Sequence, residues 1–186
     1  MTRPDPAETG HAPVVTRSDP KMVTFGCRLN IHESEIMRAH ARRAGLENVI
    51  IFNTCAVTKE AERQARQAIR KARRENPSAR IVVTGCAAQI DPQTYAQMPE
   101  VDQIIRNDRK LLPEAWVGHD APVTRVMTQP LTEEPNSFAV PSLNGFASQT
   151  RGFVQVQNGC DHRCTFCIIP YGRGPSRSVP VGGIVD

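Results

Sequence analysis

The chain has 186 residues, which is enough for one full domain and part of a second, because domains commonly hold roughly 100–200 residues. Hydrophobic residues make up 39% and charged residues 23%, as is usual in soluble globular proteins, and no apolar run approaches the ~20 residues that cross a membrane. The net charge of +4 permits a nucleic-acid partner without requiring one.

Residues 1–20 contain acidic side chains and lack the apolar stretch of a leader peptide, so they fit neither a secretory nor a mitochondrial signal. We predict that they form a disordered tail of a cytoplasmic protein that does not bind a membrane. The cytosol keeps thiols reduced, so the 6 cysteines are poor candidates for structural disulfides. Metal ligation is the leading interpretation of these cysteines.

Residues 21–116 alternate short apolar runs with helical segments, which predicts an α/β domain with a parallel sheet of the flavodoxin or Rossmann-like kind. Helices are expected between the runs, over residues 32–45 and 58–77, with Thr58 as the N-cap of the second. The cationic face of that second helix fits either a solvated surface or an RNA contact. The strand candidates are residues 22–26, 49–54, 80–85 and 103–107.

The remaining residues divide into a linker and the start of a second domain. Residues 117–150 are rich in proline and small polar residues and show no sustained periodicity, which indicates a linker. Residues 151–159 alternate apolar and polar side chains and lead directly into Cys160, which predicts a strand at the start of a further domain over residues 151–186.

Three cysteines, Cys160, Cys164 and Cys167, lie in one short stretch with the spacing C-x3-C-x2-C. Three thiolates can hold three irons of a cubane cluster and leave the fourth iron open for a substrate, whereas a structural zinc site normally uses four ligands. His162 could supply a fourth ligand, although its place inside the same tight loop makes that geometry awkward. The missing fourth cysteine favours chemistry over simple electron transfer.

The other three cysteines, Cys27, Cys55 and Cys86, each follow a predicted strand. Parallel strands deliver their carboxyl ends to one edge of a sheet, where ligands bind in open α/β folds, so the three thiols could converge. The alternative is that each is a buried structural cysteine, because a free cysteine packs as a small hydrophobe. No G-x-G-x-x-G motif follows the first strand, which argues against a nucleotide site there.

The sequence around both sets resembles the radical S-adenosylmethionine methylthiotransferases over most of residues 21–178, in the stretches FGCRLNIHESE, NTCAVTKEA, VTGCAAQ and QNGCDHRCTFCIIPYGRGPSRS. The resemblance implies that residues 151–186 begin a radical-SAM (β/α) barrel and that the protein holds two 4Fe–4S clusters. Cys160, Cys164 and Cys167 would hold the cluster that binds and cleaves S-adenosyl-L-methionine. Cys27, Cys55 and Cys86 would hold the cluster that carries the methylthio sulfur. Phe166 would lie beside the cofactor's adenine, or would serve ordinary core packing.

Within that family, residues 53–58 and 173–178 look most like the branch that acts on threonylcarbamoyladenosine in tRNA. The implied reaction adds a methylthio group to C2 of that adenosine, next to the anticodon, with the tRNA anticodon loop as substrate and a cellular reductant as partner. The alternatives are the isopentenyladenosine tRNA branch, the ribosomal-protein branch, or a non-catalytic zinc or iron–sulfur module.

Several polar residues near the cysteines have two possible roles. Asn53, Thr54 and Gly85 could be neighbours of a cluster, or could serve packing and turns. Around the second set, phosphate contact and solvated surface are equally open for Arg163, Arg173 and Arg177. Members of the family continue into most of a barrel and an RNA-binding domain, so we expect this polypeptide to be a truncation that is inactive alone.

Overall fold

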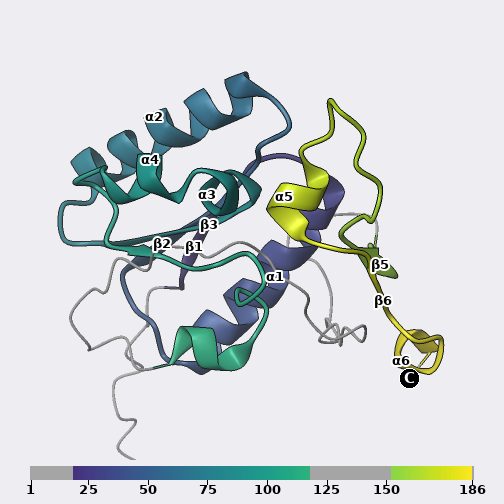
Figure 1. Ribbon diagram of the computed structural model, residues 1–186. Coiled ribbons are helices and arrows are strands. Elements are labelled where there is room, and N and C mark those ends of the chain that lie inside the picture. The colour runs from purple at the N-terminus through teal and green to yellow at the C-terminus, as the bar shows by residue number, and fades with distance from the viewer. Residues whose placement is uncertain (1–18, 118–151, 186) are drawn as a thin grey trace, which may run out of the picture.

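Four parallel strands form the centre of the N-terminal part of the chain (Figure 1). The computed structural model describes residues 19–117 and 152–185. The strands lie in the order β1-β2-β3-β4, and the predicted α/β class with a parallel sheet is confirmed. Their bounds are β1 (Lys21–Thr24), β2 (Val49–Thr54), β3 (Arg80–Gly85) and β4 (Gln103–Ile104).

Helices cover both faces of this sheet, because the strands carry apolar side chains on both sides (Figure 1). On one face, Ile36 and Met37 of α1 pack with Val82 and Trp116. On the other, Ile69 of α2 packs with side chains from β2 and β3. The helices are α1 (Arg28–Arg43), α2 (Lys59–Glu75), α3 (Cys86–Ile90), α4 (Pro92–Ala96) and the 3-10 helix η1 (Pro113–Trp116).

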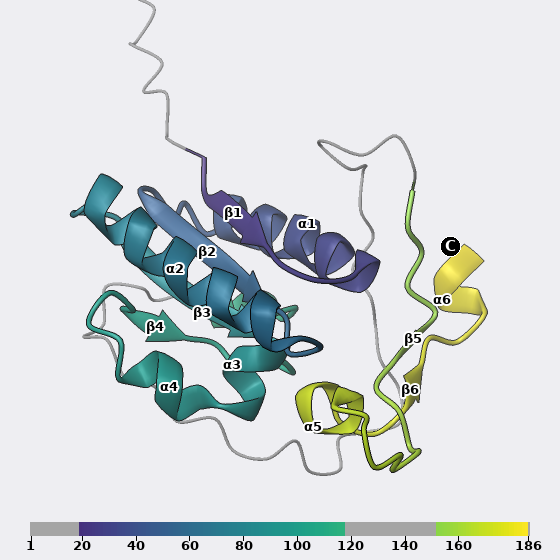
Figure 2. The same ribbon diagram turned by 90° about the horizontal axis from the view of Figure 1, so that it is seen from above.

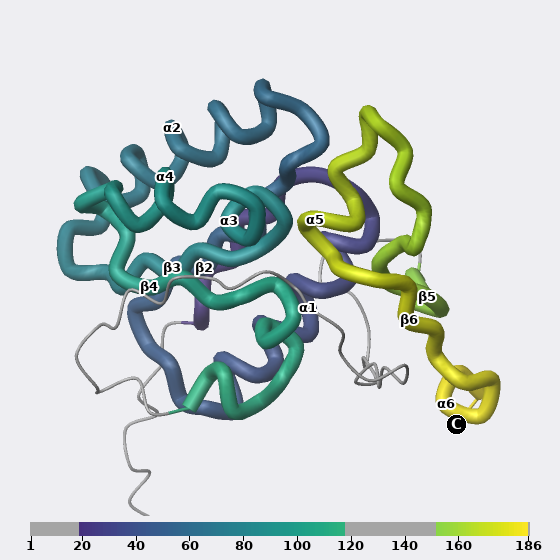
Figure 3. Tube along the Cα trace, viewed as in Figure 1, coloured from purple at the N-terminus to yellow at the C-terminus, as the bar shows by residue number. Residues whose placement is uncertain are grey.

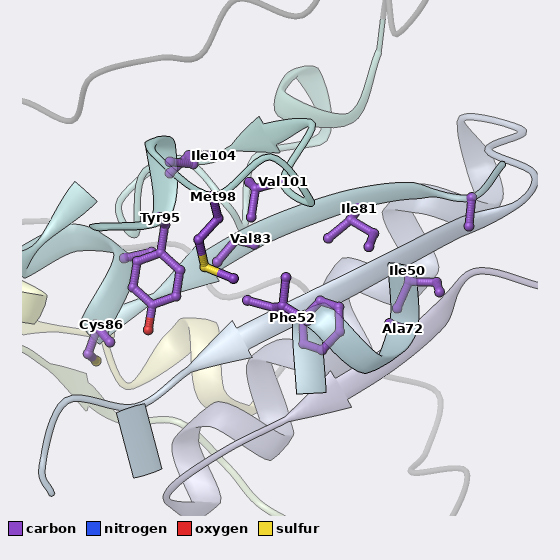
Figure 4. Packing of buried hydrophobic residues seen from close by; sticks show 14 of the residues in the cluster. Ile50, Phe52, Ala72, Ile81, Val83, Cys86, Tyr95, Met98, Val101 and Ile104 are labelled. Carbon is purple, nitrogen blue, oxygen red and sulfur yellow. The ribbon is translucent and has the colours of Figure 1, made fainter. Parts of the chain in front are cut away.

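Figure 4 shows the core on the α2 face. Phe52 and Ile81 lie on neighbouring strands, and Tyr95 and Met98 cover them from the α4 side. Cys86 sits at the margin of this core, so the edge that carries the cysteines is continuous with the packed interior.

The helices begin at or near the residues that the sequence predicts. Helix α2 begins one residue after Thr58, whose Oγ1 accepts a hydrogen bond of 3.1 Å from the backbone N–H of Ala61, as the capping pattern predicts. Helix α1 begins at Arg28, four residues before the predicted start, because the chain turns into the helix directly after Cys27. The predicted strand at 103–107 is reduced to the two residues of β4.

Residues 152–185 form a smaller unit beside the carboxyl ends of the strands (Figures 2 and 3). Its elements are β5 (Gln157–Asn158), α5 (Ile169–Arg173), β6 (Arg177–Ser178) and α6 (Gly182–Val185). The strand predicted over 151–159 forms only at β5, because the one strand that pairs with it in the described part of the chain, β6, is antiparallel and two residues long.

Other predictions lie outside the described residues. The disordered tail falls almost entirely on residues 1–18, and the linker almost entirely on 118–151. No described helix combines the length and the apolar character needed to cross a membrane. The start of a barrel over 151–186 stays a prediction.

Candidate metal centre

The fold brings Cys27, Cys55 and Cys86 to one edge of the sheet. Cys27 precedes α1, Cys55 follows β2, and Cys86 is the first residue of α3, directly after β3. Thr54 and Gly85, which precede the last two, are partners in the β2–β3 register. Gly26 is so close to Cys55 that a Cβ added to it would lie 2.7 Å from the Cys55 sulfur. The parallel topology therefore gathers these cysteines as expected.

Each sulfur of this set has one polar partner, which comes from helix α1 for Cys27 and from loops for the other two. Cys27 Sγ donates to Asn30 Oδ1 at 3.6 Å, the Val57 N–H donates to Cys55 Sγ at 3.5 Å, and Asn107 Nδ2 donates to Cys86 Sγ at 3.9 Å. The N–H groups directed at the Cys55 and Cys86 sulfurs favour the thiolate form, which is the form that binds metal, whereas Cys27 is itself the donor to Asn30. Burial nevertheless raises the pKa of the Cys86 thiol, although Arg173 and Lys110 oppose that effect.

Beneath the cysteines lies a buried ion network of Glu33, Lys110 and Arg173. Glu33 and Lys110 are fully buried and Arg173 is 4% exposed. The Lys110 Nζ lies 2.5 Å from Glu33 Oε2, and Arg173 Nη1 lies 2.7 Å from Glu33 Oε1. Burial alone would raise the pKa of Glu33, but the two cations outweigh it and lower the pKa to about 2. Glu33 is therefore ionised at neutral pH.

The network places the permanent positive charge of Arg173 at the sheet edge. The Glu33 carboxylate raises the pKa of Arg173 in spite of burial. Burial lowers the pKa of Lys110, and Glu33 opposes that shift. The Arg173 cation under the cysteines favours anionic groups there, such as thiolates and the clusters that they hold.

Asn53, Thr54 and Gly85 have packing and hydrogen-bonding roles beside the cysteines. Asn53 Oδ1 accepts from Lys110 Nζ at 3.3 Å, and Thr54 Oγ1 donates to the Thr84 carbonyl at 2.7 Å. Gly85 has φ +98°, and an added Cβ would lie 2.4 Å from the Thr54 backbone. Only glycine fits this turn from β3 into Cys86.

The second cysteine set forms a separate loop closed by α5 and the residues after it. The Cys160 N–H donates to the Gly174 carbonyl at 3.1 Å, and the Cys167 N–H donates to the Cys164 carbonyl at 3.0 Å. Cys164 is exposed, while the other two cysteines of the set are partly buried. Phe166 is 90% exposed, so it does not pack into the core of the described residues, and its place beside an adenine stays a prediction.

The three arginines around this loop differ in environment. Arg163 is exposed and donates to the Cys160 carbonyl at 3.1 Å, and Arg177 donates to the Arg173 carbonyl at 3.0 Å. Both interpretations of Arg173, phosphate contact and solvated surface, are wrong, because its guanidinium is buried against Glu33. The partner is 140 residues away and is invisible to a local pattern.

The spacing of the side chains distinguishes a site for a single metal ion from a site for a cluster. Within residues 19–117 and 152–185, no three His, Cys, Asp or Glu side chains are gathered tightly enough to hold one ion. Thiolates around a single zinc would be roughly 4 Å apart, since each Zn–S bond is about 2.3 Å. A cubane places its ligands on separate irons and so accepts a wider spacing. Three free thiols at one edge, two of them with N–H donors and with the Arg173 cation close by, fit such a group.

Comparison with known proteins places these features in a wider group. The model of a family described as "Uncharacterized protein family UPF0004" matches residues 20–106. The threonylcarbamoyladenosine tRNA methylthiotransferase MtaB of Rickettsia prowazekii is 54% identical over 165 residues, which are 89% of this chain and 38% of that protein. MtaB of Aquifex aeolicus is 37% identical over 175 residues, 87% of this chain and 42% of the relative.

A relative with a different substrate in its name is also similar. The tRNA-2-methylthio-N(6)-dimethylallyladenosine synthase of Sorangium cellulosum is 35% identical over 191 residues, 88% of this chain and 37% of that protein. The chain therefore spans about two fifths of the length of the curated relatives that it matches.

Proposed function

We infer that the chain belongs to the methylthiotransferase family and, from that premise, propose that it forms part of a radical S-adenosylmethionine enzyme that methylthiolates tRNA. The similarity to one of these enzymes extends over nearly nine tenths of the chain. The observation that carries the proposal is that α5, the helix that follows the second cysteine set, packs against Cys86 of the first set. Gly172, five residues after Cys167, lies against Cys86, where an added Cβ would be 3.0 Å from the Cys86 Cβ.

Each cysteine set would hold one 4Fe–4S cluster. Cys27, Cys55 and Cys86 would hold one at the sheet edge, and Cys160, Cys164 and Cys167 would hold the other in the second loop. When bound, such clusters with an open iron supply the electron that cleaves S-adenosylmethionine and a site that carries sulfur. A cellular reductant must deliver that electron.

The chain's own residues supply positioning and electrostatics. Asn30, Asn107 and the Val57 N–H orient the thiols, as the sulfur contacts indicate. Arg173 and Lys110 place positive charge under the first set, which favours its anionic form. The exposed Phe166 is available to stack on the adenine of the cofactor, because base stacking needs an accessible ring.

The high identity to one relative supports a substrate branch. The relative at 54% identity carries threonylcarbamoyladenosine in its name, whereas the one that carries dimethylallyladenosine is 35% identical. We therefore propose threonylcarbamoyladenosine next to the anticodon as the substrate and the cytoplasm as the compartment. The dimethylallyl branch is the second candidate.

Iron content tests the cluster assignment. The chain is purified without oxygen, reconstituted with iron and sulfide, reduced, and then examined by electron paramagnetic resonance with and without S-adenosylmethionine. We expect about eight irons per chain, about four after joint replacement of Cys160, Cys164 and Cys167 by alanine, and a spectral change with S-adenosylmethionine only when this set is intact.

A single substitution at His162 distinguishes a three-thiolate cluster site from a four-ligand metal site. His162→Ala leaves the iron count unchanged if three thiolates are the ligands, and lowers it if His162 is a fourth ligand. Stoichiometric zinc in place of iron would contradict the enzyme proposal and favour a structural metal module.

A further inference from the structure

Helix α5 is joined to the first cysteine set through two asparagines. Asn30 Oδ1 accepts from Arg173 Nη2 at 2.6 Å and also from the Cys27 thiol. Asn107 Nδ2 donates to the Gly172 carbonyl at 2.5 Å and approaches the Cys86 sulfur. Each asparagine therefore contacts both a thiol of one set and the helix that follows the other set.

Arg173 is the centre of this connection. Besides Asn30, its guanidinium contacts both carboxylate oxygens of Glu33, at 2.7 Å and 3.2 Å, and Asn158 Oδ1 at 3.0 Å. Glu33 and Asn30 belong to α1, whereas Asn158 lies two residues before Cys160. One side chain thus joins the sheet domain to both ends of the second cysteine loop, since Arg173 itself follows Cys167 by six residues.

The chemistry of the contacts requires a guanidinium. Its planar fork offers five N–H donors, and here they meet three acceptor side chains that are themselves almost fully buried. An ammonium group has one centre and cannot span these acceptors in the same plane. The charge is also fixed, because Arg173 cannot lose its proton.

We propose that Arg173 is a positioning residue that holds the second cysteine loop in fixed register against the first cysteine set, through its fork on Glu33, Asn30 and Asn158. The contacts themselves are seen in the structure, whereas their role in positioning two clusters rests on the proposed function. In that setting Arg173 sets the separation across which the two halves of the reaction meet.

Hydrogen–deuterium exchange of the whole metal-free chain tests the contact without any cluster. We expect Arg173→Gln to speed amide exchange in residues 157–178 by about tenfold or more, while strands β2 and β3 keep their protection. The control, Arg63→Gln on α2, also removes one arginine from an ion pair, but that pair is local and exposed. It should leave both regions unchanged.

A conservative variant guards against general unfolding. Arg173→Lys keeps a second basic group beside Glu33, in addition to Lys110, but it lacks the fork. We expect it to keep β2 and β3 protected and still to release residues 157–178. Native protection of residues 157–178 in Arg173→Lys, or in a folded Arg173→Gln, would overturn the proposal.

The iron-loaded chain gives a second, independent measurement. Two reduced clusters at a fixed short separation broaden each other's paramagnetic resonance signals, because magnetic dipoles couple at short range. We expect Arg173→Gln and Arg173→Lys to keep the wild-type iron content and to lose this broadening. Unchanged broadening with full iron would contradict the positioning role, whereas failure of the wild-type chain to bind iron would contradict only the proposed function.

Discussion

Arg173 Nη1 lies 2.7 Å from Glu33 Oε1, although the two residues are 140 positions apart in the sequence. Lys110 contacts the other oxygen of the same carboxylate, so one buried anion holds two cations from separate parts of the chain. Such a carboxylate is hard to replace, because its removal leaves both buried basic groups without an anionic partner and with only neutral amide oxygens to accept their hydrogen bonds.

Glu33→Gln should therefore destabilise the fold by about 3–5 kcal/mol, the usual effect of breaking a buried ion pair. Chemical denaturation followed by fluorescence measures this free energy, since the single tryptophan, Trp116, is buried and donates to the Lys110 carbonyl at 2.8 Å. Glu60→Gln is the matched control, because Glu60 pairs with Arg63 on the exposed face of α2. A Glu33→Gln variant as stable as the control would refute this role.

The same carboxylate predicts an acid-sensitive stability. Glu33 has a folded pKa of about 2 against an ordinary value of 4.5, so the folded state binds this proton less readily than the unfolded state. The stabilisation is complete above about pH 4.5 and is lost as the pH falls toward 2, by about 3 kcal/mol in total. Denaturation at a series of pH values measures this slope. Glu33→Gln should show a shallower slope over that interval, and equal slopes would contradict the assignment.

Gly85 should not tolerate a side chain. Gly85→Ala places a Cβ 2.4 Å from the Thr54 backbone at φ +98°, and neither strand can move without breaking the β2–β3 register. We expect a loss of at least about 1–3 kcal/mol, together with lower iron retention at the adjacent Cys86. Gly182→Ala is the control, because an added Cβ there meets nothing within 4 Å. Equal denaturation midpoints for the two variants would be inconsistent with the strained turn.

Much of the sheet domain follows from sequence patterns, because strands β2 and β3 and the Thr58 cap are local features of periodicity and side-chain chemistry. The convergence of the cysteines follows in turn from parallel topology. The ion network does not, because its members are distant in sequence. One signal was present for Glu33: it lies three and four residues before Ile36 and Met37, on the buried face of α1.

The second unit was harder to predict for a different reason. Alternation over residues 151–159 indicates a strand, but a strand forms only where a neighbour pairs with it, and the described residues offer that at β5 alone. Val154 and Val156, just before β5, remain exposed. The alternation in the sequence does not tell which neighbouring segment, if any, packs on these side chains.

The thiols should differ in reactivity according to their surroundings. In the reduced, metal-free chain, Cys164 is exposed, whereas Cys86 is buried and its thiol pKa is raised by that burial. Alkylation requires an accessible thiolate, so we expect iodoacetamide at pH 8 to modify Cys164 at least about tenfold faster than Cys86. Mass spectrometry of the digested chain at successive times gives both rates from one sample. Denaturation in urea should make the two rates similar, which shows that the difference comes from the fold. Equal alkylation rates in the native chain would mean that the sheet edge around Cys86 opens readily. The contact of Gly172 with Cys86 could then not hold α5 against the first cysteine set.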